Sequence, residues 1–412
     1  MKNKKAFILL SFTCCVVAFF IKCSNEPNVG NDPRGNVYAG AASCRSCHPA
    51  IYDSYIETAH YNATRPTTKD NVYGSFSPGK NIFSYDFSTK IVMEDRDSGL
   101  YQVAYVNGKQ TEAHRFDITF GKKHAQTFLY WNNNKTFELP VSFYTSVKSW
   151  ATSPGFSKTE ANFKRPIGIN CYQCHSSFVD NKLSMTSEGV EETLDKNSII
   201  YGIDCERCHG PAINHVNYHT AYPDIKEAKY IVTSRSLNRQ QKLDECAVCH
   251  SGNEKQKEIS AFKFKRGDTL GNFFSPWAKR RNNIEFDVHG NQYQLLSQSK
   301  CFLGSKTLTC TTCHNPHSDA SNNLVEYSKK CLTCHPDTKH SSTVMSGTSI
   351  NIINENCIDC HMPKQASEAI TFYLQGSPQK NAYLLRTHKI AIYLKNTGIV
   401  QTFVKFYSKN KS

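Results

Sequence analysis

Hydrophobic and polar positions are arranged differently in the two halves of this chain. In residues 71–165, aromatic and β-branched residues interrupted by polar ones form five runs, at 81–87, 100–106, 114–120, 126–131 and 135–144. Turn-forming sequences separate them, at Asp97-Ser98-Gly99 and Asn107-Gly108. Short runs of this composition separated by such turns are typical of antiparallel strands. The segment 71–165 is therefore predicted to be a β-rich meander.

The pattern changes after residue 165. Residues 166–365 contain a cysteine motif six times, and successive copies lie 34, 41, 64, 21 and 26 residues apart. Intervals this short have room for one helix and a loop each. We therefore expect an α+β protein, with a mostly helix-and-loop scaffold and an antiparallel β-rich insertion.

The N-terminus has the features of an export signal. Residues 1–5 include three lysines, and residues 6–21 are apolar apart from Ser11 and Thr13. Sixteen residues are fewer than a membrane span needs, so residues 1–22 are predicted to be a signal peptide. Lys22-Cys23-Ser24 resembles the acylation site of bacterial lipoproteins, with Cys23 as the lipidated residue. An uncleaved anchor and plain soluble secretion stay open as alternatives, and all three place the protein outside the cytoplasm.

Composition narrows the class of protein further. The chain has 412 residues and a mean hydropathy of −0.52, which fits one or two soluble domains and excludes a polytopic membrane protein. Cysteine is unusually abundant, at 18 residues. Fourteen of them form seven Cys-x-x-Cys-His motifs: Cys44, Cys47 and His48; Cys171, Cys174 and His175; Cys205, Cys208 and His209; Cys246, Cys249 and His250; Cys310, Cys313 and His314; Cys331, Cys334 and His335; Cys357, Cys360 and His361.

This motif is the attachment site of c-type haem. The two cysteines form thioether bonds to one edge of the porphyrin, and the histidine is the proximal iron ligand. Zinc sites do not need histidine at the next position, a redox dithiol would occur once, and a disulfide framework would not repeat one spacing. The sequence therefore predicts seven covalently bound haem c groups. Cys14 and Cys15 fall in the signal peptide, and Cys301 is either a buried thiol or a partner in an intermolecular disulfide.

Histidines are numerous enough to provide a second ligand for every iron. Sixteen histidines less the seven proximal ones leave nine, whereas the chain has only five methionines. Bis-histidine haems have lower potentials than His/Met haems, so we expect a low-potential cytochrome.

The motifs and their surroundings resemble the cytochrome c554-like multihaem cytochromes. The segments that carry the resemblance are SCRSCHPAIYDSYIETAHYNAT, GKKHAQTFLYW with ELPVSFYTSVKSWATSPGF, CERCHGPAINHV, VHGNQYQLLSQSKC, LTCTTCHNPH and CIDCHMPK. The resemblance implies distal ligands at His60, His124, His215, His289, His317 and His388. His340, which follows CLTCHP, is the seventh candidate.

Departures from related enzymes limit the activities implied. There is no Cys-x-x-Cys-Lys site of the ammonia-forming nitrite reductases, and there are seven motifs where hydroxylamine oxidoreductases have eight. The expected organisation is a signal peptide (1–22), a tether (23–37), a first haem module (38–70), a haem-free β-rich segment (71–165), a six-haem region (166–365) and a C-terminal segment with a distal ligand candidate (366–412).

Two functional hypotheses follow. One is an electron carrier of the cell envelope, held to a membrane by its lipid anchor and exchanging electrons with redox proteins. The other is an oxidoreductase in which one five-coordinate haem binds a small nitrogen or sulfur compound, with His114 or His219 available as proton donors. The formal charge of +14 does not indicate nucleic-acid binding, because the propionates of seven haems would offset most of it.

Overall fold

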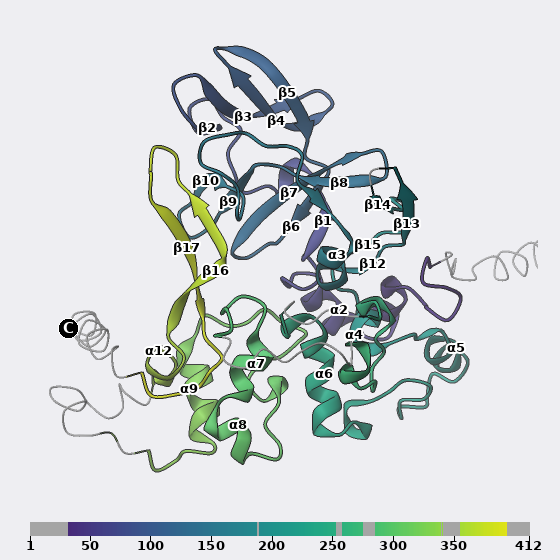
Figure 1. Cartoon of the computed structure of the whole chain (residues 1–412). Coiled ribbons are helices and arrows are strands. Elements are labelled where there is room, and N and C mark those ends of the chain that lie inside the picture. The colour runs from purple at the N-terminus through teal and green to yellow at the C-terminus, as the bar shows by residue number, and fades with distance from the viewer. Residues whose placement is uncertain are drawn as a thin grey trace, which may run out of the picture.

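The computed structural model describes residues 32–187, 189–252, 258–274, 285–338, 340 and 355–393. Sheets lie at one end of the molecule and the motif-bearing helices at the other (Figure 1). The predicted signal peptide and Cys23 lie outside the described residues. Within the described part of the chain, no helix combines the length and apolar character that crossing a bilayer requires.

A four-stranded antiparallel sheet forms the outer end of the β region. Its strands follow chain order: β2 (Ile82–Ser84), β3 (Thr89–Arg96), β4 (Gly99–Val106) and β5 (Lys109–Arg115). The β4–β5 turn is Asn107-Gly108, whose φ angles of 51° and 78° are the left-handed conformation that these residue types adopt in tight hairpins. Both turns expected from the sequence therefore join neighbouring strands.

A seven-stranded antiparallel sheet lies between this sheet and the helices (Figure 1). Five of its strands pair in the order β1-β6-β7-β8-β11, while β9 pairs with both β7 and β10. The strands are β1 (Thr64–Pro66), β6 (Ile118–Phe120), β7 (Ala125–Asn132), β8 (Lys135–Glu138), β9 (Val141–Tyr144), β10 (Ser149–Thr152) and β11 (Pro166–Ile167).

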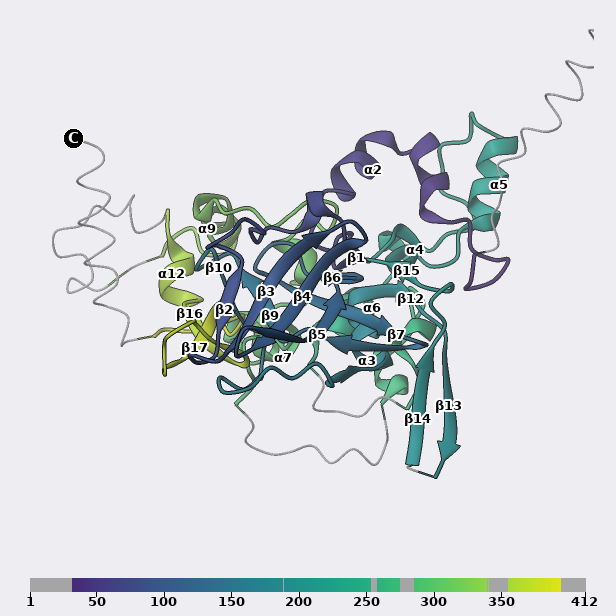
Figure 2. The same ribbon diagram turned by 90° about the horizontal axis from the view of Figure 1, so that it is seen from above.

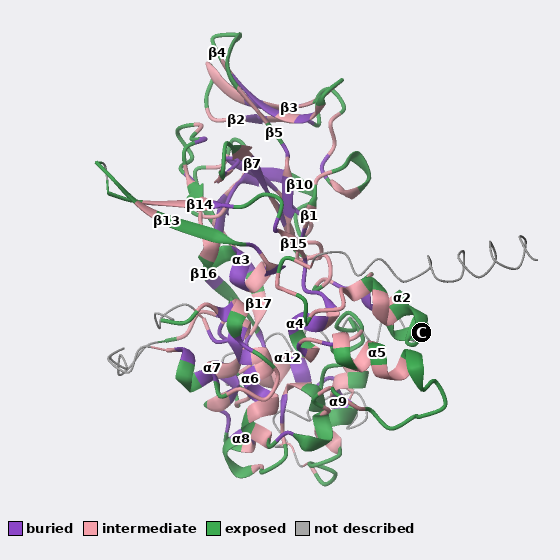
Figure 3. Cartoon of the chain, turned by 90° about the vertical axis from the view of Figure 1, so that its right-hand side faces the viewer, coloured by how far each residue is buried: buried purple, intermediate pink, exposed green. Residues whose placement is uncertain are grey.

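Aromatic side chains join the two sheets in one hydrophobic core. Phe116, Phe128 and Trp150 are at most 3% exposed, and their rings contact one another at centroid distances of 4.5–6.3 Å. A Cβ at Gly74 would lie 2.0 Å from the Trp150 ring, so the chain passes the indole where only glycine fits. Buried residues accordingly concentrate in the sheets, whereas many helical residues are exposed or half-buried (Figure 3).

The helical end consists of short helices. The α-helices are α2 (Pro49–Tyr55), α3 (Ile169–His175), α4 (Cys205–His209), α5 (Ile213–Ala221), α6 (Arg239–His250), α7 (Gln292–Ser297), α8 (Lys300–Gly304), α9 (Leu324–Leu332) and α12 (Cys357–His361). The 3-10 helices are η1 (Ala41–Ser46), η2 (Lys69–Asn71), η3 (Ser234–Ser236), η4 (Ala261–Lys263), η5 (Leu270–Phe273) and η6 (Cys310–Thr312). Helix α3 joins this end to the seven-stranded sheet, because Tyr172 is fully buried against Ile118 and Leu129.

Three further strand pairs lie beyond the β-rich insertion. They are β12 (Ser176–Phe178) with β15 (Ile200–Tyr201), β13 (Asn181–Thr186) with β14 (Gly189–Leu194), and β16 (Lys364–Tyr373) with β17 (Lys380–Arg386). The β13–β14 hairpin projects from the molecule (Figure 2), and Phe372 and Tyr383 of β16–β17 pack against Tyr144. The α+β class is confirmed. Over the described residues strand is about as abundant as helix, because these hairpins add to the strands of the β-rich insertion.

Candidate functional site

Every Cys-x-x-Cys-His motif lies within a helix or begins in one. Four motifs lie wholly within α3, α4, α6 and α12, and the other three begin within η1, η6 and α9. Residues three and four apart share one face of a helix, so both cysteines and the histidine of a motif point the same way. Side-chain caps begin four of these α-helices: Asp204 on α4, Asn238 on α6, Asn323 on α9 and Asn356 on α12 each accept a hydrogen bond from a backbone N–H of the first turn.

The first cysteines of different motifs meet in pairs. Side-chain hydrogen bonds join Cys205 to Cys44, Cys246 to Cys310, and Cys331 to Cys357. The first motif is thus beside the third, the fourth beside the fifth, and the sixth beside the seventh.

The second motif reaches this series through the fourth. Cys249 Sγ lies 3.8 Å from the carbonyl oxygen of Gln173. The third and fourth motifs are also close, since Cys249 raises the pKa of the Cys208 thiol, although burial is the main cause of that increase. The pKa of Cys331 is raised mainly by its hydrogen bond to Cys357. Cys313 also raises this pKa, so the fifth motif is close to the sixth. All seven motifs therefore belong to one contiguous cluster.

Three proximal histidines face a predicted distal histidine across a short gap. The Nε2 atoms of His209 and His317 are 3.5 Å apart, and their ring centroids 5.8 Å apart. The centroid distance is 6.0 Å between His250 and His60, and 6.1 Å between His314 and His388. Two imidazole nitrogens about 2 Å from one metal are about 4 Å apart, which sets their ring centroids about 6 Å apart. The three separations match that requirement.

Two more pairs are apparent from electrostatic interactions. The pKa of His175 is lowered to about 4, mainly by burial and then by the nearby His289. Burial lowers the pKa of His340, and His361 adds to that effect.

The two remaining motifs are less clearly paired. Burial is the main cause of the lowered pKa of His209. His48 and His215 also lower this pKa, so both of them lie near His209. Among the described residues, His335 and His124 have no histidine partner of this kind; the His124 Nδ1 lies 3.0 Å from the Tyr383 hydroxyl.

Of the two histidines outside these sets, one is remote from the motifs. His114 lies on β5, where its Nε2 is 3.0 Å from Glu112 and its ring packs against Tyr130. His219 lies on α5 with its ring 4.6 Å from that of His215. The sheet position of His114 therefore argues against a role as a proton donor at a motif.

Comparison with known proteins agrees with the motifs. Residues 121–210, which include the second and third motifs, match the family described as cytochrome c554 and c-prime. The multiheme cytochrome MtrA of Shewanella baltica (strain OS185) is 26% identical over 212 residues, 50% of this chain and 56% of that protein. The solved structure of the outer cell wall cytochrome OcwA has the same fold, with a TM-score of 0.53 and 14% identity over 89% of this chain and 82% of its own.

The chain is a multihaem c-type cytochrome. It spans little more than half the length of the curated relative that it matches.

The donor set of the cytochrome suits covalently bound haem. Burial is the main cause that lowers the pKa of His60 and His175 to about 4, so these imidazoles are neutral at pH 7, as metal ligation requires. Several histidines also have an oxygen acceptor at Nδ1, which leaves Nε2 for the iron. The acceptors are Gln292 Oε1 for His250 at 3.1 Å, the Lys229 carbonyl for His215 at 2.7 Å, and the Ala391 carbonyl for His361 at 2.9 Å.

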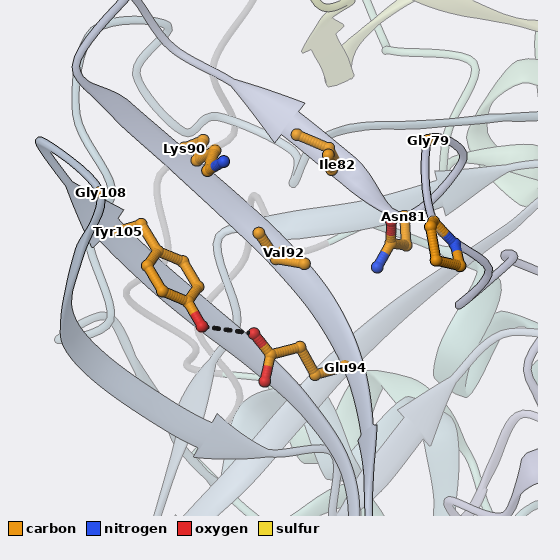
Figure 4. Close-up of a pocket in the computed structure, with 9 residues that line it drawn as sticks. Gly79, Asn81, Ile82, Lys90, Val92, Glu94, Tyr105 and Gly108 are labelled. Atoms are coloured by element: carbon orange, nitrogen blue, oxygen red, sulfur yellow. Dashed lines mark hydrogen bonds between the residues drawn. The ribbon is translucent and has the colours of Figure 1, made fainter.

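One cavity of the cytochrome is remote from these groups. It has a volume of about 350 Å³ and lies on the four-stranded sheet, where Tyr105 donates a 2.7 Å hydrogen bond to Glu94 (Figure 4). No motif residue lines it, so we do not connect it with the haem sites.

Sequence reasoning missed the charged residues that hold the motifs. Arg34 bridges Asp204 and Glu206 beside the third motif, and Arg266 contacts His209 directly. Neither arginine belongs to a motif. Only the fold distinguishes them from the other basic residues of the chain.

Proposed function

We propose that this cytochrome is a heptahaem electron carrier of the cell envelope. The observation that carries the proposal is the contiguity of all seven motifs, through thiol contacts and short inter-motif distances. Haem c supplies reversible one-electron chemistry when it is bound. The chain's own part is to attach the seven groups, cap their irons and keep them close together.

The proposed axial ligands form seven histidine pairs. The pairs are His48 with His215, His175 with His289, His209 with His317, His250 with His60, His314 with His388, His335 with His124, and His361 with His340. Ring distances support three pairs and electrostatic proximity supports two more. The His48 pair rests on a shared neighbourhood, and the His335 pair on elimination.

The proposed location and partners follow from the export features of the sequence. Lipidation at Cys23 would hold the protein at a membrane surface, and residues 24–37 would give the cytochrome reach. Its donor and acceptor would be redox proteins.

One observation favours a second candidate at a single site. His335 lacks a facing histidine among the described residues, so the sixth motif is where a five-coordinate, ligand-binding haem would lie. A small nitrogen or sulfur compound reacting there would make the protein an oxidoreductase.

One experiment distinguishes the two. The oxidised holoprotein is examined by electron paramagnetic resonance (EPR) with spin quantitation, and its haems are counted by pyridine haemochrome. Seven low-spin haems that do not respond to cyanide or nitric oxide support the carrier. One stoichiometric high-spin haem that binds them indicates the enzyme, and fewer than seven haems contradicts the heptahaem proposal.

His124→Ala tests the elimination on which the sixth pair rests. The variant should acquire one high-spin, cyanide-binding iron, as His317→Ala should for the well-defined pair with His209. If only His317→Ala does so, His124 is not an axial ligand.

A further inference from the structure

The loop that carries His289 is held together at Asp287, two residues earlier. Oδ1 of Asp287 accepts a hydrogen bond from the backbone N–H of His289 at 2.6 Å. Asn291 closes the loop, because its Nδ2 lies 3.2 Å from the carbonyl oxygen of Asp287 and 3.3 Å from that of His289. Val288, between the two, is only 3% exposed. The position of the imidazole therefore depends on what anchors Asp287.

That anchor is a β-bulge in strand β16. The pairing of β16 with β17 shifts its register between Ala366 and Thr371. Within this stretch, the backbone N–H groups of Glu368 and Ala369 both donate to Oδ2 of Asp287, the latter at 2.9 Å. Successive backbone N–H groups that converge in this way form a site for an anion. The carboxylate thus joins two segments that are 80 residues apart in the sequence.

Ser367 strengthens the same contact from inside the bulge. Its side chain is buried, with 1% exposed. Its Oγ lies 3.0 Å from Oδ1 and 3.3 Å from Oδ2 of Asp287, and accepts a hydrogen bond from the Ile370 N–H at 3.0 Å. One hydroxyl therefore stabilises both the bulge and the carboxylate that the bulge binds.

The hairpin that contains the bulge is itself fixed at both ends. It runs from the sheets to the motif-bearing helices (Figure 1). Near the sheets, the ring of Phe372 stacks on that of Tyr144 at a centroid distance of 4.0 Å. Near the helices, Arg386 forms an ion pair with Asp359 of α12. Asp287 therefore ties the His289 loop to a rigid element of the fold.

We propose that Asp287 is a positioning residue that holds His289 at the iron of the second haem. The proposal rests on the proposed function, in which His175 and His289 are axial ligands. A carboxylate can serve the loop and the bulge together, because both of its oxygens accept hydrogen bonds. An asparagine cannot, because its amide N–H₂ would face a backbone N–H at one end or the other.

The test is cyanide binding by the oxidised holoprotein of Asp287→Asn, followed by the Soret band and by EPR. A loosened His289 leaves the second iron open for a larger fraction of the time, and the apparent affinity for cyanide rises with that fraction. Loss of one hydrogen bond to a charged group should raise the open fraction about tenfold. The variant should therefore bind one cyanide at a concentration about ten times lower than the unmodified protein requires.

Three further variants make this result specific. His289→Ala should give one stoichiometric high-spin iron, and its EPR spectrum identifies the low-spin component that belongs to the second haem. Asp86→Asn is the matched control: between β2 and β3, Oδ1 of Asp86 accepts from the backbone N–H groups of Ser88 and Thr89, both at 2.7 Å. It should bind cyanide as the unmodified protein does. Ser367→Ala should act in the same direction as Asp287→Asn and provides the test if that variant does not fold.

The outcomes separate this inference from the proposed function. If His289→Ala opens one iron but Asp287→Asn leaves cyanide binding unchanged, the role of Asp287 is overturned. An equal increase in Asp86→Asn overturns it as well, because the effect would not depend on the bulge. Seven low-spin haems in His289→Ala contradict the ligand pair of the proposed function instead, and a count below seven contradicts the heptahaem proposal.

Discussion

Arg34 is predicted to be the residue on which the placement of the first motif depends most strongly. Its guanidinium, 6% exposed, contacts Asp32 at 2.9 Å, Asp204 at 2.7 Å and Glu206 at 3.3 Å. Glu206 also accepts hydrogen bonds from the backbone N–H groups of Ala39 and Gly40, just before η1. The ion cluster therefore joins the segment of the first motif to the helix of the third.

Arg34→Gln should lower the free energy of unfolding by about 3–5 kcal/mol, because it leaves buried carboxylates without their partner. The matched exposed pair is Lys69 with Asp95, whose side chains are 66% and 39% exposed. Lys69→Ala should cost at most about 1 kcal/mol. Guanidinium unfolding of the holoproteins, followed by circular dichroism, measures both. Equal losses in the two variants would refute the argument from burial.

The pH dependence gives the same argument a second test. Burial raises the pKa of Glu206 above 4.5, and Arg34 opposes that increase. Without Arg34, the pKa of Glu206 in the folded state rises further above its ordinary value of 4.5. The stability that protonated Glu206 contributes is then complete below pH 4.5 and is lost as the pH increases through the raised pKa. The stability deficit of Arg34→Gln should therefore be larger at pH 7 than at pH 5. A deficit that grows on acidification would contradict this account.

Three further predictions concern other parts of the chain. Burial raises the pKa of Glu138 to about 7 although Arg165 is 3.0 Å away. The stability that protonated Glu138 contributes below pH 4.5 should therefore be lost as the pH rises through 7. Glu138→Gln should remove about 3 kcal/mol of this pH dependence of the free energy of unfolding, measured in unfolding titrations. His60→Ala should convert one low-spin iron to high spin in EPR, and an unchanged spectrum would exclude His60 as a ligand. Cys23→Ser should release the protein from the membrane fraction, whereas persistent association would indicate an uncleaved anchor.

The sequence was most informative where structure is determined locally. The cysteines and histidine of a motif fall on one face because they are three and four residues apart. The Asn107-Gly108 turn follows from residue types that tolerate positive φ.

Strands without a buried face gave no such signal. Strand β13 is almost wholly exposed, and the two hydrophobic residues of NKLSMT, Leu183 and Met185, are 62% and 80% exposed, so they mark no buried face. Strand β16 is anchored by Phe372 packing against Tyr144, a contact between positions more than 200 residues apart. Periodicity within a short window cannot reveal a strand that is stabilised from so far away.

The partner of each proximal histidine was equally beyond the reach of local patterns. His250 faces His60, 190 residues earlier, and His209 faces His317, 108 residues later. The motifs indicate how many histidines are needed, but only the fold determines which of them meet. Arg266 was missed for the same reason, because its identity as a neighbour of His209 depends on α6 and η3 lying beside α4.

The sheets explain how short helices with few buried residues of their own keep their positions. The second motif is fixed by Tyr172, which is buried against the seven-stranded sheet. The last motif is fixed by the β16–β17 hairpin, where Arg386 forms a 2.5 Å ion pair with Asp359 of α12. His388 lies two residues after the end of β17 and faces His314, so the same hairpin also positions a proposed ligand at the fifth motif. The β-rich part is therefore a scaffold that holds the motif cluster at both ends, and changes in its core should disturb haem sites that they do not touch.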